Sequence, residues 1–275
     1  GAALVTTVAF IGWELRVPHP MLQMGFFRDL RFAMGATSIM LVFFALLGGI
    51  FVLTQYLQFV LGYSPLEAGL RVTPVGAVIL GAPLGSRLVE RVGSKVVVAG
   101  GMTLVAGALA LLSFADQATG YGVIAATLAM FGFGMGATTA PATECVMGSL
   151  PLAKAGVGSA MNDTTRLVGA ALGVAVVGSV LSSLYSSSID AATAGLPASV
   201  AAAAGDSIGS ALGAASGLEA AGAPLAEAAR AAFVDGMSGG ILTAAAVALA
   251  GAVLVALFLP ARAGRTGGPE TELAG

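Results

Sequence analysis

Four ionisable residues of the chain lie inside or beside long apolar stretches: Arg71, Glu144, Asp163 and Arg166. If those stretches cross a membrane, an ionisable group at the centre of a helix costs roughly 2.5–3.5 kcal/mol and needs a function or a partner. Such groups bind a substrate, carry protons or form ion pairs between helices. The alternative near a helix end is a side chain that reaches the interface or locks two helix ends together.

For Glu144, Asp163 and Arg166, a structural or gating charge pair is favoured over direct contact with a substrate. Asp163 and Arg166 are three residues apart, so their side chains can share one helix face. For Arg71 the two alternatives are balanced, because Glu67 lies four residues before it and can neutralise it.

Three polar side chains on apolar segments are candidates for contact with a substrate in a cavity. They are Gln55, Arg71 and Asn162. Each can hydrogen-bond a bound molecule, because polar side chains on membrane helices turn toward the bundle interior. A glutamine near a segment end could equally cap that end in the interface.

A basic segment, residues 84–95, separates two of the apolar runs. It contains Arg87, Arg91 and Lys95 against the single acid Glu90. Short loops rich in Lys and Arg remain on the cytoplasmic side of a membrane. The segment therefore predicts a tight cytoplasmic turn between two antiparallel helices.

No cluster of residues supports catalysis or a bound cofactor. The sequence contains no metal-ligand spacing, nucleophile–base pair or glycine-rich phosphate loop, and its one histidine, His19, lies between two prolines. The one cysteine, Cys145, cannot form a disulfide within the chain. We therefore expect no enzymatic activity, no cofactor and no metal.

The elements that position these residues must span a membrane, because the composition excludes an ordinary soluble domain. Of the 275 residues, 57% are hydrophobic and only 9% are charged, whereas soluble domains carry about 25% charged residues. The net charge of −2 and the lack of a basic stripe give no support to nucleic-acid binding. The bilayer is the expected solvent.

Six apolar segments are each long enough to cross the hydrocarbon core as a helix, which takes about 20 residues. Their predicted bounds are 32–56, 65–84, 96–114, 121–141, 158–184 and 238–259. We expect 1–13 to be the end of a truncated transmembrane helix, 14–31 a cytoplasmic linker and 260–275 a cytoplasmic tail. The segment 185–237, rich in Ala, Gly and Ser, is predicted to be an outer loop.

The second of these segments begins with a clear helix-start signal. Ser64 is in the N-cap position, Pro65 is the first helical residue, and Glu67 follows three residues after the cap. The helix is therefore predicted to begin at Pro65.

Two glycine patterns predict close contact between helices. Gly132, Gly134 and Gly136 recur at every second position, and Gly169 and Gly173 are four residues apart. Small residues at such spacings let neighbouring helix backbones approach each other.

The distribution of Lys and Arg favours six spans with both ends on the cytoplasmic side. Of the 12 Lys and Arg residues, all but Arg71 and Arg230 fall in segments assigned to the inside. Counting the segment 185–237 as a seventh span would place Arg262 and Arg265 outside, which this bias disfavours.

Six helices with both ends inside suggest one half of a transporter built from two such halves. The segment Gly85-Ser86-Arg87-Leu88-Val89-Glu90-Arg91-Val92-Gly93-Ser94-Lys95 resembles the loop motif of the major facilitator superfamily, with Glu90 in place of the usual Asp. Three further stretches resemble the fourteen-helix drug:proton antiporter branch of the QacA/EmrB type. They are 62–70, 141–144 and 162–173.

The resemblance implies an all-α integral membrane fold. The chain would be a six-helix half bundle made of two inverted three-helix repeats (3+3), preceded by the end of another transmembrane helix. It would supply the C-terminal half of a multidrug exporter in the cell membrane that works by alternating access and proton antiport. The implied partners are a small amphipathic substrate, protons, the lipid bilayer and the missing N-terminal half.

The resemblance also implies a role for the basic motif, which would hold helices together in one conformation by charge pairing. The motif residues concerned are Gly85, Arg87, Glu90, Arg91, Gly93 and Lys95. The alternative is that the cations only set the topology. Two other functions stay open: a specific exporter of one metabolite or antibiotic on the same fold, and a non-transporting membrane partner subunit.

Overall fold

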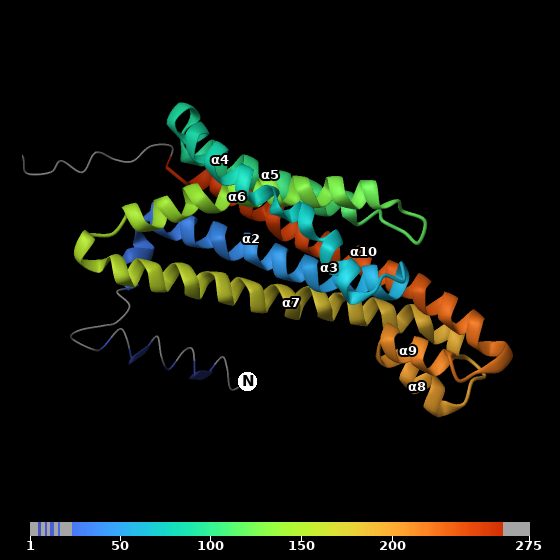
Figure 1. Ribbon diagram of the computed structural model, residues 1–275. Coiled ribbons are helices and arrows are strands. Elements are labelled where there is room, and N and C mark those ends of the chain that lie inside the picture. The colour runs from blue at the N-terminus through green and yellow to red at the C-terminus, as the bar shows by residue number, and fades with distance from the viewer. Residues whose placement is uncertain (1–4, 7–8, 10–11, 14–15, 17–23, 261–275) are drawn as a thin grey trace, which may run out of the picture.

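The computed structural model describes residues 24–260 and, before them, residues 5–6, 9, 12–13 and 16; it shows a bundle of long helices (Figure 1). The predicted truncated helix 1–13 lies largely outside the described residues, as do most of the linker 14–31 and the tail after residue 260. Within the predicted linker, residues Met24–Arg28 form a short 3-10 helix, and the first long helix begins at Leu30.

The described residues contain six helical segments that are long and apolar enough to cross a membrane. The first is α2 (Leu30–Gln55) with a π-helical turn, η2 (Tyr56–Val60), and the second is α3 (Pro65–Arg71), a 3-10 turn η3 (Thr73–Ala77) and α4 (Val78–Val92). The others are α5 (Ser94–Leu112), α6 (Tyr121–Gly148), α7 (Ala155–Thr193) and the greater part of α10 (Glu219–Phe258). The predicted all-α fold with six spans is confirmed.

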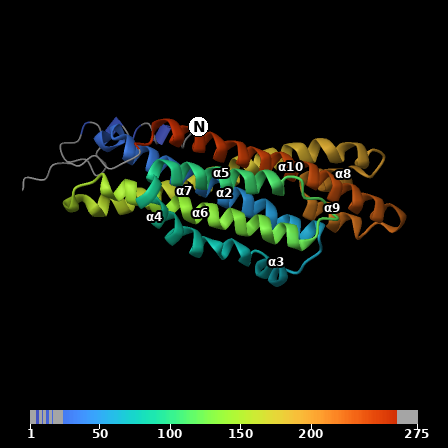
Figure 2. The ribbon, with the colours of Figure 1, turned by 90° about the horizontal axis from the view of Figure 1, so that it is seen from above.

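The packing of the helices follows the pattern of two inverted three-helix repeats. The first span, α2, packs mainly on the fifth, α7, and in the same way the fourth span, α6, packs on the second span through α4. The sixth span, α10, contacts the first, and in the same way the third span, α5, contacts the fourth. These main contacts of the first three spans thus have their counterparts when the two sets of three are exchanged. Figure 2 shows α3 and α4 along one edge of the bundle and α10 along the other.

The two predicted glycine patterns are sites of close backbone contact. Added Cβ atoms at Gly132 and Gly136 would meet the backbone of Val75 and Val78, so α6 lies directly against the second span. Gly169 and Gly173 of α7 abut α2 in the same way. Four small positions therefore fix two of the main helix contacts, as packing in a bilayer requires.

The two ends of the bundle differ in charge. The basic end holds the start of α2, the α4–α5 turn and the end of α10, with Arg28, Arg31, Arg87, Arg91 and Lys95 (Figure 1). Arg71 and Arg230 belong to the opposite end, which also carries the short helices α8 (Ala198–Asp206) and α9 (Ile208–Ala215).

The predicted turn over residues 84–95 needs correction, because most of it is helical. Helix α4 continues to Val92, and α5 begins at Ser94, so that Gly93 alone separates them. Gly93 has φ +85°, a conformation that glycine adopts without a steric penalty. Gly85, expected in the turn, instead lies within α4 against Ala137 of α6.

The segment 185–237, predicted as an outer loop, is mostly helical in the structure. Helix α7 runs past the predicted end at Leu184 since its buried stripe continues through Tyr185 and Ile189. Helix α10 begins at Glu219 and buries Leu225, Ala229 and Phe233 before the predicted span starts. Ala and Ser lower the mean hydropathy of this segment, yet the buried residues Leu181, Tyr185 and Ile189 recur at every fourth position, as on one face of a helix. α8 and α9, with 9 and 8 residues, are too short to span a membrane.

Two further boundaries differ from the prediction. Helix α6 passes through Pro141 and ends at Gly148, because Ala142, Cys145 and Val146 are buried on its core-facing side. The second span is broken between Arg71 and Val78 by the turn η3, which contains Pro74. Proline lacks the N–H that an uninterrupted helix needs.

Candidate functional site

Arg71 lies at the end of α3, where two tyrosine rings enclose its guanidinium group. The guanidinium carbon is 3.7 Å from the ring centroid of Tyr63 and 5.5 Å from that of Tyr121. The hydroxyl of Tyr121 donates a hydrogen bond to the backbone carbonyl of Arg71 (3.2 Å). Cation–π attraction of this kind strengthens where water is excluded.

Glu67, the expected neutralising partner of Arg71, is engaged elsewhere. Its Oε2 accepts hydrogen bonds from the backbone N–H and the hydroxyl of Ser64, both 2.9 Å long. The hydroxyl of Ser64 in turn accepts from the Glu67 backbone, which completes the predicted capping box. Within the described part of the chain, Arg71 forms no ion pair, and its buried Nε has no hydrogen-bond partner.

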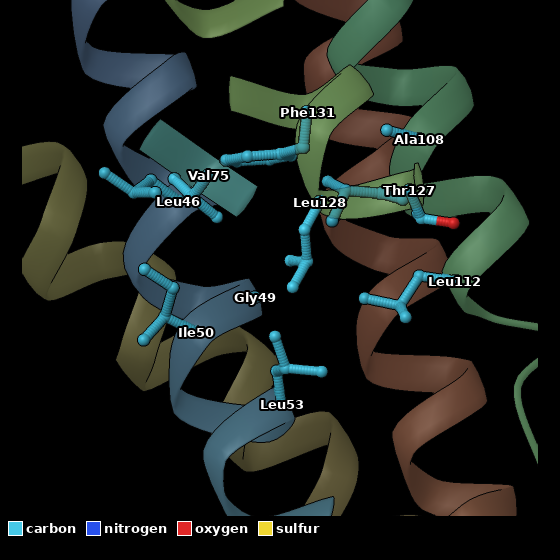
Figure 3. Close-up of a pocket in the computed structure, with 11 residues that line it drawn as sticks. Leu46, Gly49, Ile50, Leu53, Val75, Ala108, Leu112, Thr127, Leu128 and Phe131 are labelled. Carbon is cyan, nitrogen blue, oxygen red and sulfur yellow. The ribbon is translucent and has the colours of Figure 1, made fainter. Parts of the chain in front are cut away.

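A small apolar cavity lies beside α6, about two turns after Tyr121 (Figure 3). It has a volume of about 20 Å³, room for about one water molecule, and lies between α2, η3, α5 and α6. Val75, four residues after Arg71, contributes to its wall, and Thr127 supplies the one polar side chain among the lining residues. The lining residues are Leu46, Gly49, Ile50, Leu53, Val75, Ala108, Leu109, Leu112, Thr127, Leu128 and Phe131.

In the described residues, the amide of Gln55 forms no hydrogen bond to another helix. Its Nε2 donates to the carbonyl of Phe51 in its own helix (3.3 Å), as Gln58 donates to Thr54 (3.2 Å). Local bonding of this kind satisfies the amide where water is scarce. Contact of Gln55 with a substrate stays a prediction.

At the basic end, hydrogen bonds join α6 to both α4 and α7. The hydroxyl of Ser86 donates to Oε1 of Glu144 (3.3 Å), and that of Thr143 donates to Oδ1 of Asn162 (3.4 Å). Two neighbouring residues of α6 therefore contact the two helices that flank it. Asn162, expected near a substrate, is part of this link between helices.

Asp163 and Arg166 follow Asn162 on α7 but are not paired in this structure. Among the described residues no ion pair joins them, although they are three residues apart. The guanidinium carbon of Arg166 lies 5.3 Å from the ring centroid of Phe43, its buried Nε has no partner, and Asp163 is exposed. The predicted charge pair is therefore not formed in this conformation.

The basic motif makes one long-range contact through its last residue. The Nζ of Lys95 donates to the carbonyl of Leu257, near the end of α10 (3.5 Å), where a cation is favoured by the helix dipole. Arg87, Glu90 and Arg91 are exposed, and in the described residues no ion pair involves them. Charge pairing within the motif stays a prediction.

Sequence reasoning missed the aromatic partners of the two arginines. Tyr63 precedes a capped helix and Tyr121 opens α6, so each looks like an ordinary interfacial tyrosine. Phe43 lies on α2, far along the sequence from Arg166. No local pattern brings these rings to the guanidinium groups, because the contacts depend on how separate helices pack.

Comparison with known proteins adds an independent observation. Residues 5–174 match the family described as Major Facilitator Superfamily. The chain is 34% identical over 254 residues to the multidrug efflux pump LfrA of Mycolicibacterium smegmatis, which covers 92% of this chain and 50% of that protein. It is 32% identical over 178 residues to the multidrug resistance protein Stp of Mycobacterium tuberculosis, and 30% identical over 178 residues to the tetracenomycin C resistance and export protein of Streptomyces glaucescens.

The latter two alignments each cover 64% of this chain and 33% of the relative. The chain thus spans between a third and a half of the length of these curated relatives.

Proposed function

The chain belongs to the Major Facilitator Superfamily, and from this membership we propose that it is the C-terminal half of a proton-coupled exporter of small amphipathic compounds. The relatives that carry this proposal are named as multidrug efflux or resistance proteins. We place the carrier in the fourteen-helix antiporter branch, as the stretches 62–70, 141–144 and 162–173 indicate. Alternating access then moves the substrate between two halves around a central site.

The observation that carries the proposal of a half carrier is the exposed face of α7. Asp163 and Thr164 are exposed there beside Leu167, whose side chain is 71% exposed. A charge in this position is costly against lipid and is expected to face protein or a water-filled cavity. A second half of the carrier supplies both.

The distribution of burial among the spans supports the same assignment. In their most apolar stretches the second span buries 11% of its residues and the fifth 22%, against 39–56% in the others. Two spans therefore offer large free faces, and we propose that the preceding N-terminal half covers them. Lipid-facing helices would not need the polar side chains that α7 exposes.

We propose small amphipathic compounds as the transported class because relatives are named as multidrug resistance or efflux proteins. The apolar cavity, with a volume of about 20 Å³, is too small to hold such a molecule in this conformation. The name of the Streptomyces glaucescens relative favours a second candidate, a dedicated exporter of one compound. A panel of unrelated dyes distinguishes the two, because a dedicated exporter moves few of them.

The decisive experiment compares the chain alone with the chain joined to its preceding half. In cells that express both halves, we expect efflux of several amphipathic dyes, and we expect a protonophore to abolish it. The chain alone should reach the membrane without exporting dye. Dye efflux from the chain alone, or none from the joined halves at equal abundance, would contradict the proposal; the second result would favour the partner-subunit function.

We also propose that the basic end is cytoplasmic and that the membrane is the cell membrane. The test places single cysteines at the exposed positions Ala153 and Ser199 after Cys145→Ser. A membrane-impermeant thiol reagent should label the Ser199→Cys variant in intact cells, and the Ala153→Cys variant only after the membrane is opened. Labelling of both variants from one side would refute this topology.

A further inference from the structure

Arg71 forms no ion pair and no side-chain hydrogen bond in the described part of the chain, although the carboxylate of Glu67 attracts it at longer range. Its natural partner Glu67, four residues before it, accepts both of its side-chain hydrogen bonds from Ser64. Tyr63 and Tyr121 contact the guanidinium group only through their ring faces. A partly buried cation without an acceptor is unfavourable, so this arrangement is suited to receive one.

The geometry leaves the terminal nitrogens of Arg71 free for a ligand. In the described part of the chain, none of the three guanidinium nitrogens of Arg71 forms a hydrogen bond. The Nε atom is buried, whereas the two Nη atoms are not. A planar guanidinium binds a carboxylate through two parallel N–H···O hydrogen bonds. The Tyr63 ring, 3.7 Å from the guanidinium carbon, limits the movement of the group in advance, and a preorganised fork loses less entropy on binding.

The position of Arg71 is also fixed by the backbone. Tyr121 holds the Arg71 carbonyl from α6 (3.2 Å), and α3 ends immediately after it, where the turn η3 begins. Two elements, α3 and α6, therefore hold the guanidinium group in place.

We propose that Arg71, Tyr63 and Tyr121 form a carboxylate-binding site at the end of the bundle opposite to the basic end. The carboxylate has two possible sources: an acidic amphipathic substrate, or an acidic side chain of the preceding half of the carrier. The inference deepens the proposed function, since the site would select acidic compounds or close the carrier from that end. Binding to the purified chain can nevertheless be measured without transport.

The first experiment measures thermal unfolding of the purified chain with a thiol-reactive dye. Cys145 is buried and becomes reactive on unfolding, so the natural cysteine is the reporter. The probes are decanoate, decan-1-ol and decyltrimethylammonium, which share one tail and differ in the head group. We expect decanoate to raise the unfolding midpoint above the effect of the other two, because a ligand that binds the folded state stabilises it.

Substitutions then assign the effect to Arg71. Arg71→Gln should weaken decanoate binding by at least about tenfold, as expected for losing a charge-assisted hydrogen bond, and Arg71→Lys should keep part of it. Tyr63→Leu, which leaves the charge in place, should weaken binding less than Arg71→Gln does. The matched control is Arg28→Gln, an exposed arginine at the basic end, which should bind decanoate as the natural chain does.

The second experiment identifies the source of the carboxylate in the joined carrier. Export is measured for a dansylated fatty acid and a dansylated alkylamine of equal length. If the substrate supplies the carboxylate, Arg71→Gln should lower export of the fatty acid about tenfold and export of the amine much less. If the preceding half supplies the carboxylate, Arg71→Gln should lower export of both compounds equally. The proposal is overturned if decanoate gives no specific shift, or if the shift survives in Arg71→Gln. A decanoate shift in a carrier that exports nothing would keep this site and refute the proposed function.

Discussion

Ser86 of α4 donates a hydrogen bond to Glu144 of α6 across the basic end of the bundle, with 3.3 Å between Oγ and Oε1. The serine lies in the basic motif, and the glutamate lies beyond residue 141, where the sequence predicts the fourth span to end. The bond therefore connects two motifs far apart in the sequence. It also ties the second span, which is exposed over most of its surface, to α6 at the end where α4 turns into α5.

The first prediction is that Ser86 and Glu144 stabilise this arrangement together. Ser86→Ala and Glu144→Ala should each lower the free energy of unfolding by about 0.5–1.5 kcal/mol. The double variant should lose less than the sum, with a coupling of at least about 0.5 kcal/mol, because each change removes the same bond. Thermal unfolding followed at Cys145 measures the cycle. Ser159→Ala, at an exposed position of α7, is the control; strictly additive losses would show that the bond contributes nothing.

The second prediction concerns the contact of α6 with the second span. A methyl group at Gly132 would overlap the Val75 carbonyl, and overpacking costs about 1–3 kcal/mol. Gly132→Ala should therefore lower the unfolding midpoint clearly. Gly122→Ala on the same helix is the matched control, because no atom lies within 4 Å of its added Cβ; the control should be neutral or slightly stabilising. Equal effects of the two substitutions would show that the helices do not touch as described.

The sequence sufficed for the number of spans, the helix start at Pro65 and the role of the glycines, since each depends on local composition or spacing. Hydropathy failed at residues 185–237, where Ala and Ser hide the buried stripe that includes Tyr185, Ile189 and Phe233. It also failed at Pro141, because burial of Ala142 and Cys145 keeps α6 helical beyond the proline. Helix ends depend on partners that the local sequence does not contain.

The candidate site was less predictable than the fold for the same reason. Arg71 stands out in an apolar stretch, and its spacing from Glu67 suggests a pair. The capping box takes Glu67 instead, because Ser64 is closer along the chain and offers two donors. Tyr121 reaches Arg71 only after α3 and α6 have packed. Pairings within one turn of a helix compete, and tertiary contacts decide between them.

The third prediction concerns the α5–α6 turn, which Asp116 organises outside the membrane-spanning segments. The hydroxyl of Thr119 (2.8 Å) and the backbone N–H of Ala118 (2.9 Å) both donate to Asp116 Oδ1. The Thr119 bond and then the Ala118 bond hold the pKa of Asp116 below its ordinary value. The ionised form therefore stabilises the folded turn above the ordinary pKa of about 3.9, and this contribution is lost as the pH falls through the lowered pKa.

Asp116→Asn should accordingly be less stable than the natural chain near neutral pH, and the difference should shrink in acid. Unfolding midpoints measured from about pH 7 to about pH 3 test this. Asp190→Asn is the control, because the Asp190 side chain accepts no hydrogen bond in the described part of the chain. A gap that stays constant with pH would mean that the carboxylate does not stabilise the turn.

The fourth prediction is that Asp163 and Arg166 pair in another conformation of the transport cycle. In this structure Arg166 lies against Phe43, and Asp163 is exposed on the face proposed to meet the preceding half. A charge that loses its partner in the bundle is strongly unfavourable, whereas removal of both charges leaves none unpaired. Asp163→Asn and Arg166→Gln should therefore each lower export by the joined carrier, and the double variant should recover part of the loss.

Unfolding of the purified chain separates this pairing from a contact already present. Because no ion pair joins the two residues here, their effects on unfolding should be close to additive, while their effects on export should not be. The control is the double variant Asp163→Asn with Arg87→Gln, because Arg87 is exposed and lies on another helix. This variant should export no better than Asp163→Asn alone. If the Asp163–Arg166 double variant is as inactive as the worse single one at equal abundance, the residues are not partners. Contact of one of them with the substrate or with the preceding half would then explain the loss.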